Sequence, residues 1–82
     1  MAKPAPGVAA LAQVVRERRK ELGLTQEQVG DLHRNVVGEI ERGLKSPTVP
    51  QLERLGHALG MRGSELLRLA EERTRSMPED HR

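Results

Sequence analysis

The apolar residues of this chain recur every three or four positions in several separate stretches, a spacing typical of amphipathic helices. No stretch alternates apolar and polar residues in the manner of a β-strand. The first helix is predicted over residues 9–22, ending before Gly23. Its inward-facing residues are Leu11, Val14, Val15 and Leu22.

A second helix is predicted to begin at Thr25, because Thr25 and Gln28 have the spacing of a capping box. Val29 is the first inward-facing residue of this stretch. Further along, the inward-facing residues are Val36, Val37 and Ile40. The pattern stops at Gly43, a typical end of a helix.

Two more helices are predicted after a turn at residues 44–48. Thr48 and Gln51 form the second capping box of the chain. The buried face of the helix that they begin consists of Leu52, Leu55, Ala58 and Leu59. Ser64 is predicted to cap the last helix, whose apolar residues are Leu66, Leu67, Leu69 and Ala70.

These stretches predict one all-α domain over residues 8–72, a small bundle of four to five helices. Residues 1–7 contain two prolines and a glycine, and residues 73–82 are polar and contain a proline. Both ends are therefore predicted to be flexible tails.

Composition limits the core and the setting of the chain. It has 82 residues, 35% of them hydrophobic and none aromatic, so the core is thin and a dimer interface would add burial. The absence of cysteine fits a reducing cytoplasm, and no apolar run is long enough to cross a membrane. Arginine supplies 11 of the 14 basic residues. Its planar guanidinium suits phosphate and guanine.

Enzymatic chemistry is not expected. The three histidines are scattered, and there are no paired carboxylates, nucleophile motif or glycine-rich phosphate loop. A bundle of this size also has little room for a deep pocket. No cofactor, metal or small-molecule ligand is therefore predicted. Single-stranded RNA binding is disfavoured because it depends on aromatic stacking.

The longest motifs are RKELGLTQEQV (19–29), LHRNVVGEIERG (32–43) and SPTVPQLERLGHALGM (46–61). In this order they resemble the Cro/phage-repressor (XRE-type) helix-turn-helix domains. The resemblance implies a lambda-repressor-like fold with a recognition helix that enters the major groove. It also implies a repressor-like transcription regulator, a homodimer on a palindromic operator in double-stranded DNA.

The resemblance implies that the exposed start of the recognition helix reads the bases. The residues there are His33, Arg34, Asn35, Val36 and Glu39. Arginine can pair with guanine, asparagine with adenine and glutamate with cytosine, and valine can contact a thymine methyl group. The alternative is that these side chains only form a solvated helix face.

Contacts to the DNA backbone are implied on both sides of the recognition helix. Thr25 and Gln26 match the start of the first motif helix, where N–H groups and the helix dipole attract phosphate. The alternative for Thr25 is a helix cap alone. The phosphate-gripping stretch after the recognition helix matches Arg42, Lys45 and Ser46.

Two further roles are structural. Arg19 and Glu41 match a largely buried ion pair that, in the family, joins the first and third helices. Leu66, Leu67 and Leu69 exceed what one thin core needs, so the last helix is a candidate for the dimer contact. The alternative is that these leucines only complete the core of the protomer.

One segment departs from the family. Only EQVGDL separates Gln26 from His33, about three residues fewer than family members have around the turn between the motif helices. The apolar residues of this region then follow the spacing of one uninterrupted helix. They are Val29, Leu32, Val36 and Ile40.

Two architectures therefore remain open. In the first, a first motif helix of six residues is followed by a tight turn at Leu32 and His33. In the second, residues 26–42 form one long helix, and the first helix packs on a partner chain in a swapped dimer. The long helix would separate Gln26 from Arg34. It would favour the alternative function, a helical oligomerisation or protein-interaction module with impaired DNA binding.

Overall fold

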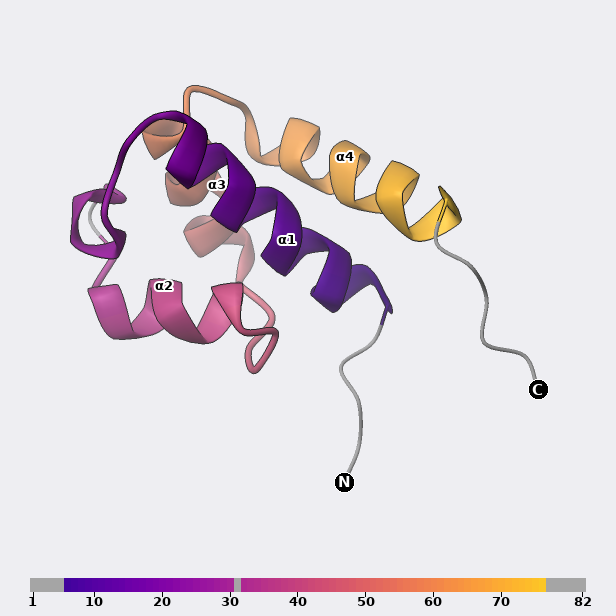
Figure 1. Ribbon diagram of the computed structural model, residues 1–82, viewed down its shortest axis with the longest axis horizontal. Helices are drawn as coiled ribbons and strands as arrows, with labels where there is room; N and C mark the ends of the chain where they lie inside the picture. The colour runs from indigo at the N-terminus through magenta and orange to yellow at the C-terminus, as the bar shows by residue number, and fades with distance from the viewer. Residues whose placement is uncertain (1–5, 31, 77–82) are drawn as a thin grey trace.

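The computed structural model describes residues 6–30 and 32–76, and it contains only helices and turns in these ranges (Figure 1). The elements are α1 (Pro6–Glu21), the 3-10 turn η1 (Gln26–Gln28), α2 (Arg34–Glu41), α3 (Val49–Ala58) and α4 (Gly63–Ser76). This confirms the predicted all-α class. None of the described helices is long and apolar enough to span a bilayer.

The helices enclose one aliphatic core. α1 packs against α4 and α2, and α3 closes the bundle by packing against α4 (Figure 1). Six of the residues predicted to face inward are fully or nearly fully buried: Val29, Val37, Ile40, Leu52, Leu55 and Leu59. The prediction was wrong for Leu22, which is 43% exposed because α1 ends one residue earlier and Leu22 lies in the following turn.

The connection from α3 to α4 is tight. A Cβ atom added at Gly56 would lie 2.7 Å from the carbonyl oxygen of Met61 and from the nitrogen of Gly63, so only glycine allows this approach. The backbone N–H of Arg62 donates to the carboxylate of Glu65 at 2.8 Å. Arg62 therefore precedes the helix, and Ser64, the predicted cap, lies within it.

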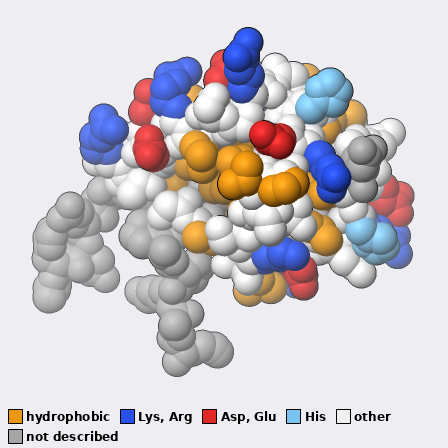
Figure 2. Space-filling view, turned by 180° about the vertical axis from the view of Figure 1, so that it is seen from behind, with side chains coloured by type: hydrophobic (Ala, Val, Ile, Leu, Met, Phe, Trp, Pro, Cys, Tyr) orange, Lys and Arg blue, Asp and Glu red, His pale blue; other side chains and the backbone are white. Residues whose placement is uncertain are grey.

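The leucines of α4 face different directions, because successive residues of a helix are about 100° apart. Leu66 is fully buried in the core, so its assignment to a dimer contact is wrong. Leu69 is half-buried and faces the groove toward α1. Leu67 is 45% exposed and lines a shallow groove with Val49 and Leu52 of α3. We call these last three residues the α3–α4 apolar face; Figure 2 shows hydrophobic side chains gathered across this side.

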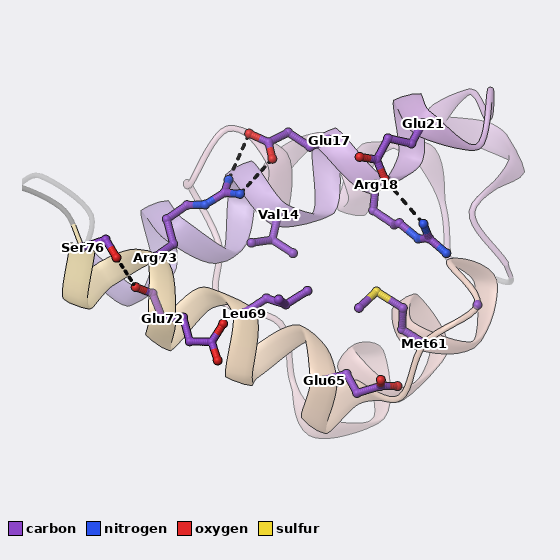
Figure 3. Close-up of a pocket in the computed structure, with 11 residues that line it drawn as sticks. Val14, Glu17, Arg18, Glu21, Met61, Glu65, Leu69, Glu72, Arg73 and Ser76 are labelled. Carbon is purple, nitrogen blue, oxygen red and sulfur yellow. Dashed lines mark hydrogen bonds and ion pairs between the residues drawn. The ribbon is translucent and has the colours of Figure 1, made fainter.

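Both terminal helices are longer than predicted. α1 begins at Pro6, within the predicted N-terminal tail, and α4 continues through residues 73–76, the start of the predicted C-terminal tail. Arg73 lies in this extension, and its guanidinium donates two hydrogen bonds of 2.9 Å to the carboxylate of Glu17 on α1 (Figure 3). The rest of the predicted tails, residues 1–5 and 77–82, lies outside the described residues.

The chain bends between η1 and α2, so the long helix over residues 26–42 is wrong. The turn lies at Gly30, whose φ of 58° is in the left-handed region. This is earlier than the predicted turn at Leu32 and His33. The first motif helix is therefore a single 3-10 turn of three residues, and the predicted six-residue helix is wrong. Val29 and Leu32 both remain buried on either side of the bend.

We expect Gly30→Ala to lower the free energy of unfolding by about 1–2 kcal/mol, because a residue with a Cβ is strained in the left-handed region. The new Cβ would also lie 3.3 Å from that of Ala58. Urea denaturation measures the change. Gly7→Ala is the control, since a Cβ there has nothing within 4 Å. Stabilisation by Gly30→Ala, as expected inside a continuous helix, would contradict the bend.

Candidate nucleic-acid interface

The helix α2 begins with a side-chain cap. His33 has an extended backbone, and its Nδ1 accepts a hydrogen bond of 3.0 Å from the backbone N–H of Asn35. The predicted opening residue of the recognition helix therefore precedes the helix. One of its ring nitrogens is committed to the cap, whereas Arg34 and Asn35 occupy the exposed first turn.

Side chains of η1 and α2 line one shallow hollow, which we call the recognition hollow. Its residues are Gln26, Arg34, Asn35, Gly38, Glu39 and Arg42. The side chain of Gln26 lies over Gly38, where an added Cβ would be in ordinary van der Waals contact with Oε1 at 3.5 Å. Five of the residues predicted to contact DNA thus lie together: three on α2, Arg42 directly after it and Gln26 on η1.

A buried ion pair fixes α2 to α1. The guanidinium of Arg19 donates to both carboxylate oxygens of Glu41, at 2.6 and 2.9 Å, and to the carbonyl oxygen of Leu24 at 2.8 Å. The side chains are only 12% and 3% exposed. Hydrogen bonding to Glu41 raises the pKa of Arg19, although burial opposes the shift. The structural pair that the sequence suggested is therefore present.

Gln26 connects this buried pair to the recognition hollow. Its side-chain amide donates to Glu41 Oε1 at 3.2 Å, and the rest of the amide lies over Gly38. The hydrogen bond to Glu41 thereby fixes the orientation of this half-buried amide. Thr25 keeps its capping position, and its backbone N–H donates to Oε1 of Gln28 at 2.9 Å.

An exposed ion pair that the sequence did not indicate lies at the edge of the hollow. Nη1 of Arg34 donates to the carboxylate of Glu27 at 2.7 Å, across the bend. The two side chains are 62% and 64% exposed. Their separation of seven positions matches no helical pairing rule, so only the bend itself could have revealed the contact.

Arg42 lines the recognition hollow, and the remaining predicted contact residues are more dispersed. Nε of Arg42, the C-cap of α2, donates to the carbonyl oxygen of Gly38 at 3.2 Å, and its Nη groups form no hydrogen bond or ion pair with the described residues. Val36 is half-buried and packs against the core. Lys45 is half-buried in the loop after α2, whereas Ser46 lines a separate groove with α1 and α4.

A family model described as "HTH_3: Helix-turn-helix" matches residues 15–66. This range contains η1, the bend, α2, α3 and both members of the buried ion pair. It also contains every residue of the recognition hollow.

Two similar proteins are regulators by name. An uncharacterised HTH-type transcriptional regulator of Methanothermobacter thermautotrophicus is 40% identical over 50 residues, which cover 57% of this chain and 72% of the relative. The restriction-modification controller protein C.AhdI of Aeromonas hydrophila is 32% identical, with a TM-score of 0.68 over 72% of this chain and 94% of its own.

A third likeness shows the fold alone. The restriction-modification controller protein C.Esp1396I, solved as a tetramer with its natural 35 base-pair operator, is 21% identical. Its TM-score is 0.76 over 88% of this chain and 99% of its own. The shortened segment between η1 and α2 is therefore compatible with the architecture of these proteins.

We expect Glu41→Ala to lower the free energy of unfolding by about 3–5 kcal/mol, because it leaves the Arg19 guanidinium buried without its counter-charge. Urea denaturation measures the loss. Glu17→Ala is the matched control: it breaks the more exposed pair with Arg73 and should cost no more than about 1 kcal/mol. Equal losses in the two variants would show that the buried pair has no special role.

Proposed function

Because this chain belongs to the HTH_3 helix-turn-helix family, a family of DNA-binding transcriptional regulators, we propose that it represses transcription by binding a palindromic operator as a homodimer. In this proposal α2 enters the major groove of double-stranded DNA in the cytoplasm, and the protein has no catalytic role. The observation that carries it is the recognition hollow, which gathers side chains suited to reading bases on one exposed face.

The proposed division of roles follows the geometry of that face. Arg34 and Asn35 lie in the first turn of α2, and Glu39 lies one turn later, so these three are the proposed base readers together with His33 and Val36. In this motif, the contacts to base edges in the major groove concentrate near the N-terminus of the recognition helix. Arg34 suits guanine and Asn35 suits adenine.

The phosphate contacts are proposed for the residues that flank these readers. Gln26 and Thr25 lie at the start of η1, and Arg42 and Lys45 lie at and beyond the end of α2, with Ser46 next to them. Contacts on both sides would fix the register of α2 on the duplex without carrying sequence information. The bend at Gly30 supports this function over an oligomerisation module, because it keeps Gln26 beside α2.

The proposed dimer contact is the α3–α4 apolar face, with Leu67 at its centre. Leu67 and Val49 are 45% and 69% exposed and line the same groove, and neighbouring exposed apolar side chains are typical of an interface. A two-fold axis through this face would repeat the same contact on both protomers. Leu69 remains a secondary candidate at the groove toward α1.

The DNA contact is tested by titrating random-sequence duplex DNA and following fluorescence anisotropy at several salt concentrations. We expect log K to fall with log salt by about 0.9 per phosphate contact. Lys45→Ala should weaken binding to all sequences and reduce the slope by about 1. Arg68→Ala, which removes a positive charge from α4, is the control and should change little. If the protein binds duplex DNA with an affinity that does not depend on salt, or does not bind it at all, the proposed DNA-binding function is wrong.

The dimer contact is tested by Leu67→Lys, which should give a monomer because it places a charge in the apolar face. Analytical ultracentrifugation measures the mass in solution. Leu22→Lys is the matched control, since Leu22 is 43% exposed but does not line this face. A dimer that persists in Leu67→Lys, or a wild-type monomer, would rule out this face.

A further inference from the structure

We propose that Glu27 is a specificity-determining residue, which holds the guanidinium of Arg34 in place for base reading and discourages it from contacting phosphate. The inference rests on the proposed DNA-binding function and names a residue for which no DNA-related role was predicted. In this view Glu27 touches the reader and not the bases, so it is a positioning residue.

The first argument is the geometry of the contact. The carboxylate of Glu27 accepts a hydrogen bond of 2.7 Å from Nη1 of Arg34, and the two residues come from different elements, η1 and α2. A free arginine side chain at the first turn of a helix samples many rotamers, and fixing it on binding costs conformational entropy. The ion pair restricts that freedom before DNA arrives.

The second argument is the number of donors that remain. A guanidinium has five N–H donors in a rigid fork, and Glu27 engages Nη1 of Arg34 alone. The remaining donors still include a pair that can bind guanine O6 and N7 together. Supporting a contact residue from a second residue is the general way to keep such bidentate geometry.

The third argument is charge. Arg34 and Glu27 are both more than 60% exposed on the face with the recognition hollow, so an unpaired arginine there would bind any nearby phosphate. A carboxylate beside it offsets that attraction and repels the DNA backbone at close range. Glu27 would thus lower the affinity for non-operator DNA more than the affinity for the operator. Specificity depends on the difference between these two affinities.

The shortened segment explains why the contact exists in this chain. Six residues separate Glu27 from Arg34, and the left-handed turn at Gly30 folds η1 back toward the first turn of α2. With more residues around the turn, η1 would extend into a longer helix and Glu27 would lie farther from Arg34 along the chain. The departure from the family pattern and the new role therefore have the same cause.

The test combines selection of binding sites from a pool of randomised duplex DNA with affinity measurements. The variants are Glu27→Gln, Arg34→Ala, the double variant, and Glu72→Gln. The last removes the same charge from an exposed pair with Arg68 on α4 and is the matched control. Competition between the selected duplex and random duplex DNA then gives the ratio of the two affinities for each protein.

We expect wild type and Glu72→Gln to select the same site. Glu27→Gln should bind random duplex DNA more tightly, and its specificity ratio should fall about 10-fold, a difference of about 1.4 kcal/mol. Glu27→Gln should lose its sequence preference at the same base pair as Arg34→Ala. The specificity ratio of the double variant should fall no further than that of Arg34→Ala alone. Unchanged stability in Glu27→Gln would separate this effect from misfolding.

An unchanged site and specificity ratio in Glu27→Gln would overturn the inference while leaving the proposed function intact. Additive losses in the double variant would also overturn it, because Glu27 would then act independently of Arg34. If wild type enriches no sequence at all, the proposed function fails, and the inference fails with it.

Discussion

The position of α2 depends on the buried ion pair between Arg19 and Glu41. Two hydrogen bonds join these side chains, a third ties Arg19 to the backbone at Leu24, and Gln26 completes the carboxylate's contacts. One charged cluster therefore fixes α1, the segment before η1, η1 itself and the end of α2. In a core without aromatic side chains, such a directional contact specifies an orientation that aliphatic packing alone defines less sharply.

The same cluster connects the core to the exposed face. Gln26 donates to Glu41 on one side and lies over Gly38 on the other, while Glu27, the next residue, holds Arg34. η1 is only one turn long, yet its neighbouring side chains support both the interior and the proposed DNA-reading surface. The left-handed turn at Gly30 makes this possible, because it directs η1 against α2 without a longer connection.

The sequence predicted most of the fold because its helices are amphipathic and their ends carry local signals. The capping boxes at Thr25 and Thr48 and the buried leucines of α3 follow from neighbours three or four residues apart. Such local rules could not predict whether the chain bends between η1 and α2, since Val29 and Leu32 are equally suited to a continuous helix. The contacts of Glu27 with Arg34 and of Arg73 with Glu17 join separate elements, and only the folded arrangement of η1, α1 and α4 reveals them.

The central claim is that the face of α2 with the recognition hollow meets DNA. The most direct measurement is a map of backbone amide chemical shifts in isotopically labelled protein titrated with a duplex selected from a random pool. The account predicts the largest changes from Gln26 to Arg42, especially at Asn35 and Gly38, and small changes along the exposed side of α4. Changes confined to α1 and α4, with α2 unaffected, would contradict it.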